Sequence, residues 1–169
     1  YINNPDLDIE RRTVDIDANW TDTYDKDKIV DTIEKAVKKV NSSYSIKLVR
    51  EPDTNKSMGF KIMDDKGITI SKLDMDIKNN PFYVICTIND VDVKYSNFNK
   101  MMADKLLSIS GTHIFRRVKD ILDIYLIILD NKIRYKDIQE VLKYEDKKLG
   151  NFEVMLNNRN LLKESYSKL

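Results

Sequence analysis

Residues 10–20 read ERRTVDIDANW, and the alternation of apolar and charged side chains within them predicts a β-strand over 12–18. Val14 and Ile16 alternate with Asp15 and Asp17. Side chains two residues apart on a strand project from one face, so both carboxylates are expected on the same side of a sheet. Such a pair is either a metal-binding site or the solvated face of the sheet. The Asp-x-Asp pattern recurs four more times in the chain, so spacing alone does not decide between them.

The hydrophobic period changes twice after this strand. Helical spacing of apolar residues predicts a helix over 25–40. Two-residue alternation then predicts strands at 44–50, 58–63, 68–77 and 82–88, with a hairpin turn at 64–67. Helical spacing returns from Asn97 and predicts helices at 97–110, 114–130, 135–148 and 151–169. This order predicts an α+β fold, in which a core with a mixed or antiparallel sheet (1–96) precedes a C-terminal helical bundle (97–169).

Composition limits the classes of protein that the chain can belong to. Hydrophobic residues make up 41% and charged residues 34%, which is typical of a folded soluble protein. The net charge is +1, so no global field attracts nucleic acid or an anionic membrane. Cys86 is the single cysteine, which excludes an internal disulfide. No apolar run reaches the roughly 18 residues that span a bilayer, and we expect a cytoplasmic protein without a membrane partner.

A second pair of aspartates lies on a later strand, within SKLDMDIKNNP at 71–81. Asp74 and Asp76 share one face of this strand, and Leu73 and Met75 take the other. Like charges side by side in a sheet repel, but bound cations would neutralise them. This strand therefore offers a third carboxylate beside Asp15 and Asp17, or it is an exposed edge.

Two predicted helices carry charged residues next to their apolar stripes. Lys105 borders the stripe of the first helix, whereas Tyr125 and Ile128 belong to the expected core face of the second. The first turns of the second helix carry a mostly basic group, namely Arg116, Arg117, Lys119 and Asp120. Lysine and arginine contacts of this kind could hold a triphosphate. A surface network of salt bridges is the other interpretation.

Taken in order, these motifs resemble the nucleotidyltransferase toxins of the AbiEii/AbiGii abortive-infection family, within the DNA polymerase beta-like superfamily. The family's strand motif R-x-T-x-D-I-D is matched by Arg11, Thr13, Asp15, Ile16 and Asp17. Its third carboxylate is matched by Asp76 in MDI, with Asp74 in LDM as the alternative. Its tyrosine and A-E-K-L helix are matched by Tyr95 and residues 103–106 (ADKL), and its R-x-x-K-D-x-x-D motif by Arg116, Lys119, Asp120 and Asp123. The resemblance covers roughly residues 10–130.

The resemblance implies a site with two Mg²⁺ ions and a nucleoside triphosphate. Asp15 and Asp17 would hold the metals, and Asp76 or Asp74 would complete the site and act as the base. Lys105 would bind phosphate, with Asp120 orienting it or positioning the substrates. The implied nucleotide-binding residues are Arg11, Thr13, Lys105, Arg117 and Lys119.

The implied activity is transfer of a nucleotide from an NTP to an acceptor hydroxyl, such as the 3′ end of a tRNA. The family also implies a bacterial toxin that a cognate antitoxin neutralises. Its Gly-Gly or Gly-Ser phosphate-binding element is expected upstream of Tyr1, together with the N-terminal helices of the core. The alternatives are a catalytically inactive binding or regulatory module with this fold, or a nucleotidyltransferase that acts on a protein or a small molecule.

Overall fold

The computed structural model describes residues 15–51, 57–88, 90–111, 118–130 and 132–166. Contacts divide the chain into two compact units. Among the described residues, the sheet unit runs from Asp15 to Pro81 and the helical unit runs from Phe82 to Tyr166. The described elements include a mixed sheet and six helices, which confirms the predicted α+β class. Each unit is described by itself.

The sheet unit contains four strands in the order β1-β4-β3-β2. Their bounds are Asp15–Trp20 for β1, Ser45–Arg50 for β2, Ser57–Met63 for β3 and Thr69–Ile77 for β4. β1 pairs with β4 in parallel, whereas β4, β3 and β2 pair antiparallel. All four strands were expected within two residues of these bounds, apart from residues 12–14, which lie outside the described residues.

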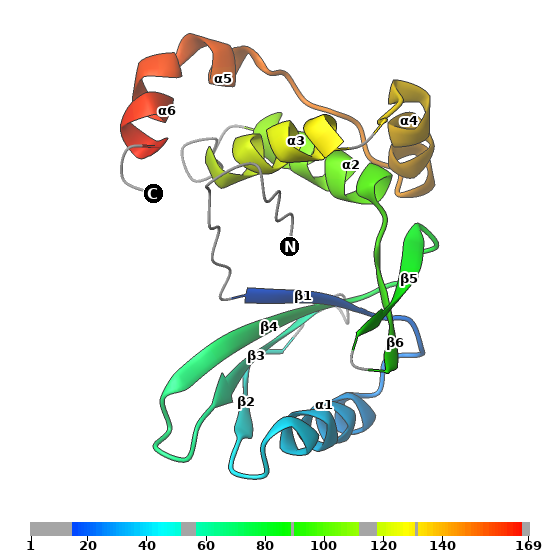
Figure 1. Cartoon of the computed structure of the whole chain (residues 1–169), viewed down its shortest axis with the longest axis vertical. Coiled ribbons are helices and arrows are strands. Elements are labelled where there is room, and N and C mark those ends of the chain that lie inside the picture. The colour runs from blue at the N-terminus through cyan, green and yellow to red at the C-terminus, as the bar shows by residue number, and fades with distance from the viewer. Residues whose placement is uncertain (1–14, 52–56, 89, 112–117, 131, 167–169) are drawn as a thin grey trace. The chain divides into compact units, whose positions relative to one another are not determined.

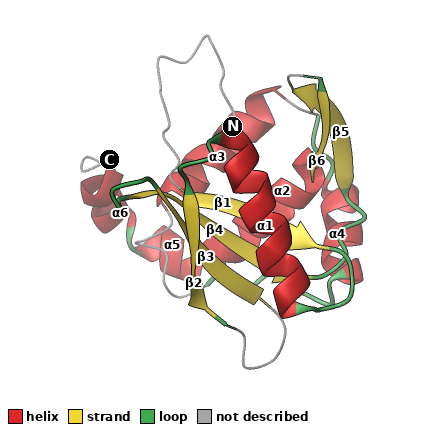
Figure 2. Ribbon diagram, turned by 90° about the horizontal axis from the view of Figure 1, so that it is seen from below, coloured by secondary structure: helices red, strands yellow, loops and turns green. Residues whose placement is uncertain are grey.

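Helix α1 (Lys26–Val40) lies along one face of this sheet (Figures 1 and 2). The side chain of Asp25 accepts a hydrogen bond from the backbone N–H of Lys28 and caps the helix start. Lysines in the last turn complement the helix dipole. The apolar stripe of α1 consists of Ile29, Ile33 and Val37, all buried.

The core of the sheet unit lies between α1 and alternate residues of the central strands. Met58 and Phe60 of β3 and Leu73 and Met75 of β4 are buried against the α1 stripe. Because strand side chains alternate between faces, the intervening residues of β3 and β4 lie on the other face of the sheet. That second face carries the charged residues considered below.

The hairpin between β3 and β4 turns at residues 64–67, as the sequence predicts. The backbone N–H of Gly67 donates to the carbonyl oxygen of Asp64 at 3.1 Å. Gly67 has φ +75°, a conformation that glycine adopts without steric cost. The Asp64 side chain also accepts a hydrogen bond from the backbone N–H of Ile68.

The helical unit begins with a separate two-stranded sheet. β5 (Tyr83–Ile88) and β6 (Val91–Ser96) form an antiparallel hairpin. The sequence analysis places the boundary near residue 96, whereas the contacts group this hairpin with the helices. Phe82, just before β5, packs on the helical core, and its ring lies edge-on to Tyr144 with centroids 5.3 Å apart. β6 was not predicted as a separate strand.

Five helices of the helical unit lie in the described part of the chain. They are α2 (Phe98–Ile109), α3 (Val118–Asp130), α4 (Tyr135–Tyr144), α5 (Glu153–Asn157) and α6 (Arg159–Tyr166). The core comprises Met102, Ala103, Ile127, Ile138, Val141 and Leu142, from α2, α3 and α4. Within the described ranges, every helix is too short or too polar to cross a membrane.

The buried face of α3 differs from the expectation. Tyr125 and Ile128, expected in the core, are 53% and 58% exposed. Asp123 and Ile127 are buried instead, with 2% and 0% of their surfaces exposed. The helix therefore buries a face that carries carboxylates, because Lys105 of α2 forms ion pairs with Asp120 and Asp123.

Candidate functional site

The register of β1 and β4 gathers the predicted carboxylates on one face of the sheet. Asp17 lies directly opposite Asp74, and Asp15 lies opposite Lys72. Asp76 is one step further along, opposite Asn19. Since alternate residues of both strands pack against α1, these side chains project from the face away from the helix. The structure thus brings the two aspartate pairs onto neighbouring strands.

Asp74 already has a basic partner on this face. Arg50 Nη2 donates to Asp74 Oδ1 at 2.7 Å, although Arg50 belongs to β2, two strands away. The register shifts between Leu48 and Arg50, which pair with Phe60 and Gly59 respectively, and leaves Val49 without a partner in β3. This β-bulge places Arg50 on the same face as Asp74.

Because Gly59 has no side chain, the side chain of Arg50 can cross over β3 and reach Asp74. A Cβ atom at Gly59 would lie 3.2 Å from the Cβ of Arg50 and 3.3 Å from Asp74 Oδ1. A larger side chain would therefore occupy the space through which the guanidinium reaches Asp74. Glycine in a strand interior commonly marks such a close approach.

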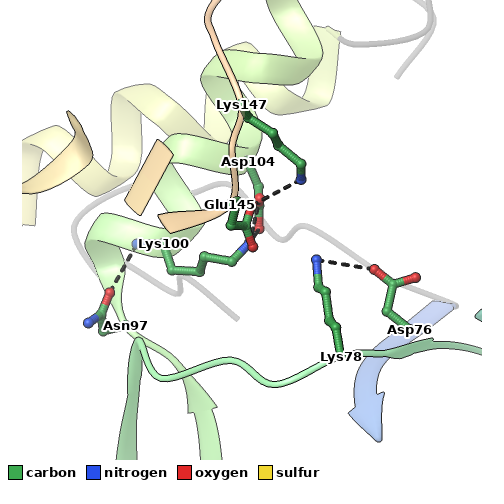
Figure 3. Close-up of polar contacts among 7 residues, drawn as sticks. All are labelled: Asp76, Lys78, Asn97, Lys100, Asp104, Glu145 and Lys147. Atoms are coloured by element: carbon green, nitrogen blue, oxygen red, sulfur yellow. Dashed lines mark hydrogen bonds and ion pairs between the residues drawn. The ribbon is translucent and has the colours of Figure 1, made fainter. Parts of the chain in front are cut away.

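Asp76 has a different environment. Its Oδ2 lies 3.3 Å from the Nζ of Lys78, in an ion pair that solvent reaches (Figure 3). The sequence analysis preferred Asp76 as the third carboxylate and left Asp74 as the alternative. The register favours Asp74, because it faces Asp17 directly.

The donors on this face match magnesium chemistry in part. Mg²⁺ is commonly held by one or two carboxylates together with substrate phosphates, and Asp15 and Asp17 supply two such carboxylates. Within the described residues, no group of three or more His, Cys, Asp or Glu side chains is arranged to hold a metal ion. Both candidates for a third carboxylate are in ion pairs instead, Asp74 with Arg50 and Asp76 with Lys78.

Lys105 joins two helices of the helical unit. Its Nζ lies 2.6 Å from Asp120 Oδ1 and 2.7 Å from Asp123 Oδ2. The side chains of Asp120 and Asp123 are only 10% and 2% exposed. Asp120, which the resemblance implies would orient Lys105, is thus in contact with it, and Asp123 is a second partner. These ion pairs explain why α3 turns its carboxylates inward toward α2.

The charge of this cluster bears on the role of Lys105. Burial by itself would lower the pKa of Lys105, but hydrogen bonds and attraction from Asp120 and Asp123 outweigh burial and raise the pKa above its ordinary value. The lysine is therefore charged at neutral pH. Among the described residues, two carboxylates occupy the Lys105 ammonium, and a phosphate would compete with both of them. The geometry favours a role for Lys105 in joining α2 to α3.

Lys100 is a buried charge that the sequence analysis did not single out. Its side chain is 4% exposed, and its Nζ lies 2.5 Å from Asp104 and 3.1 Å from Glu145 (Figure 3). Lys147 adds an ion pair to Glu145 at 3.0 Å. The Asn97 side chain accepts from the backbone N–H of Lys100 and caps α2. This cluster links the start of α2 to the end of α4.

Several predicted site residues lie outside the described residues. Arg11, Thr13 and Arg117 are among them, so their contacts with nucleotide or carboxylates stay predictions. Lys119 is described and is exposed in the first turn of α3. Asp15, Asp17, Asp74 and Asp76 belong to the sheet unit, and Lys105, Lys119 and Asp120 belong to the helical unit.

The structure adds two residues to the candidate set, Arg50 and Lys100. The i,i+4 spacing of Lys100 and Asp104 was a visible signal for an ion pair on a helix. Arg50 gave no such signal, because regular alternation along β2 would place it on the α1 side. Only the bulge between Leu48 and Arg50 brings it to the carboxylate face.

Comparison with known proteins adds no assignment. The chain matches no family model and no curated protein. The interpretation of the site therefore depends on the geometry above and on the motifs in the sequence.

Proposed function

We propose that the chain is a Mg²⁺-dependent nucleotidyltransferase that moves a nucleotide from an NTP to an acceptor hydroxyl, as a toxin of an abortive-infection system. One observation carries this proposal. The register of β1 and β4 sets Asp17 opposite Asp74, with Asp15 and Asp76 on the same face. Four carboxylates gathered on one polar sheet face, next to basic residues, supply the hard oxygen ligands that Mg²⁺ takes and the positive charge that phosphates need.

Asp15 and Asp17 are the residues that would hold the metal. When bound, Mg²⁺ neutralises charge on the triphosphate and aligns the reacting oxygens. Asp74 takes the proton from the acceptor hydroxyl, whose oxygen forms a bond to the α-phosphorus. The bond between the α-phosphorus and the bridging oxygen breaks, and pyrophosphate leaves. Asp76, by its position opposite Asn19, is the weaker candidate for the base.

A catalytically inactive binding module is the second candidate function. It is supported by the ion pairs of Asp74 with Arg50 and of Asp76 with Lys78, which satisfy both carboxylates without a metal. In such a module the aspartates of β1 and β4 would form a charged surface for a partner. The enzyme and the module differ in whether transfer depends on Asp15 and Asp17.

A transfer assay separates these two functions. The full chain is incubated with Mg²⁺, each labelled NTP in turn and total tRNA. We expect label in tRNA, and we expect Asp15→Asn and Asp17→Asn to abolish it. Asp65→Asn is the matched control, since Asp65 is exposed in the β3–β4 turn. Absence of transfer with every NTP from a folded protein would contradict the enzyme. Label that appears instead on protein or a small molecule would change the acceptor and keep the reaction.

Thermal unfolding gives a readout that needs no acceptor. A ligand that binds the folded state raises the melting temperature. Mg²⁺ with an NTP should raise it for the wild type and for Asp65→Asn, and should leave it nearly unchanged for Asp15→Asn. An equal response in all three proteins would show that the ligands bind elsewhere.

A further inference from the structure

Three lysines stand side by side on the face of the sheet that carries the aspartates. Lys47 of β2 lies opposite Lys61 of β3, and Lys61 lies opposite Lys72 of β4. Lys72 in turn lies opposite Asp15 of β1. Lys47 and Lys72 are exposed, and Lys61 is half-buried. We call Lys47, Lys61 and Lys72 the lysine row.

The lysine row is unfavourable in the protein alone. Like charges directly opposite each other on one face of a sheet destabilise it. Among the residues that the structure describes, none of the three lysines has an ion-pair partner. Arg50, on the same face, differs because its guanidinium is paired with Asp74. The row is therefore a line of positive charge without ion pairs in this part of the chain, and Asp15 faces it only at its β4 end.

The shape of the row indicates the kind of anion that it would bind. Neighbouring strands lie about 4.8 Å apart, so three lysines on adjacent strands extend over roughly 10 Å. A line of ammonium groups suits a chain of phosphates better than a single anion, and lysine is a common phosphate ligand. The row begins at β2, at one edge of the sheet, and ends beside Asp15 on β1, at the other edge.

We propose that the lysine row binds the phosphodiester backbone of a nucleic-acid acceptor and directs its reactive end toward Asp15 and Asp17. The chemistry at that end rests on the proposed function, but binding by the row does not require it. Net charge of +1 gives the chain no general affinity for nucleic acid, so a local row of this kind must supply it.

Binding is measured with a fluorescently labelled single-stranded RNA, by anisotropy, at salt concentrations from low to moderate. The test variant is K47Q/K61Q/K72Q. The matched control is K35Q/K38Q/K39Q, which removes three lysines from α1 on the opposite side of the sheet. We expect the row variant to bind at least about tenfold more weakly and its log–log salt slope to fall by about 2, as loss of three phosphate contacts implies. The control should change affinity far less.

Three results would overturn the proposal. One is equal weakening in the row variant and the control, which would mean that only total charge matters. Another is row-dependent binding of inorganic tripolyphosphate without binding of RNA, which would assign the row to a nucleotide. The third comes from Lys61→Gln, which should raise the melting temperature without RNA because it removes the central like charge. A lower melting temperature would contradict the repulsion. This single variant also serves if the triple variant does not fold.

RNA binding and nucleotide transfer are measured separately, on the wild type, on Asp15→Asn and on the row variant. Failure of this inference can then be told apart from failure of the proposed function. If RNA binds the row and no transfer occurs in any protein, the catalytic proposal fails and the binding site stands. If transfer occurs and the row variant binds RNA like the wild type, the catalytic proposal stands and the binding site on the lysine row fails.

Discussion

At the scale of single residues, Gly59 and Arg50 determine the ion pairing of Asp74 on the sheet face that carries the aspartates. Arg50 reaches Asp74 only because Gly59 leaves room above β3. Asp74 faces Asp17, so its partner controls how much negative charge a cation would meet there. If the face binds Mg²⁺ as proposed, Arg50 and the metal ion would compete for the charge of this carboxylate.

Arg50→Gln should strengthen Mg²⁺ binding, because it removes the competing cation from Asp74. The ion pair is about half exposed on both sides, so stability should change by less than about 1 kcal/mol. The measurement is the Mg²⁺-dependent rise in melting temperature. Lys26→Gln is the control, since it removes another exposed ion pair of the sheet unit, with Glu51. A smaller Mg²⁺ response in Arg50→Gln than in this control would contradict the competition.

Lys105→Met should destabilise the folded state by about 3 kcal/mol, because it removes a cation that two buried carboxylates share. The pKa of Lys105 is raised in the folded state above 10.5, so its stabilising effect is fully present below that pH and is lost as pH rises through the folded pKa. Urea unfolding of the wild type and the variant should show a constant difference at neutral pH and a shrinking one above about pH 10.5. Adding Asp120→Asn and Asp123→Asn should recover much of the loss; a lasting deficit would mean that packing, and not charge, dominates.

At the scale of elements, local pattern predicted most helices and strands but not their neighbours. Two-residue alternation gave the strands of the sheet unit, since one face of each packs on α1. β6 carries the same alternation, in VDVKYS, and was missed although the signal was present. Hydrophobic spacing misplaced the buried face of α3, because Lys105 makes Asp120 and Asp123 acceptable inside.

For the candidate site, too, the sequence predicted which strand faces carry the residues but not which residues lie opposite one another. The sequence identified Asp15, Asp17 and the later aspartate pair as strand residues on a shared face. It could not place Asp17 opposite Asp74, because parallel pairing of β1 with β4 joins segments more than fifty residues apart. Arg50 and the lysine row depend on a bulge and on register across three strands. Neither property is local in the sequence.

Gly150→Ala should disrupt the attachment of the segment after α4 to the end of α2. The backbone N–H of Gly150 donates to Ser110 Oγ at 2.9 Å, and an added Cβ would collide with the carbonyl oxygen of Ser110. We expect a loss of about 1–3 kcal/mol, as for other overpacked sites. Chemical unfolding measures it, with Gly111→Ala as the control because a Cβ there meets nothing closer than 3.7 Å. Equal effects at both glycines would contradict the close approach.

At the scale of the whole molecule, the residues that the structure describes form two hydrophobic cores. One lies between α1 and the four-stranded sheet, and the other lies among α2, α3 and α4. A cavity in one core removes contacts from residues of that core first. The two units therefore offer separate sites at which stability can be altered.

Phe60→Ala should destabilise the sheet unit by about 3–5 kcal/mol, because the ring is 1% exposed and its loss leaves a cavity. Hydrogen exchange should accelerate in β3, β4 and α1 more than in α2 and α4. Met102→Ala, 2% exposed in the other core, should give the reverse pattern. Uniform acceleration throughout the chain in both variants would show that the two cores unfold as one.

The bulge in β2 marks a position at which that strand can lose a residue while its neighbours keep their partners. Val49 has no partner in β3, and Leu48 and Arg50 already pair with consecutive residues there. A chain lacking Val49 would pair regularly, and Arg50 would still lie opposite Gly59. Val49 is thus a place where this sheet can shorten without losing the contact between Arg50 and Asp74.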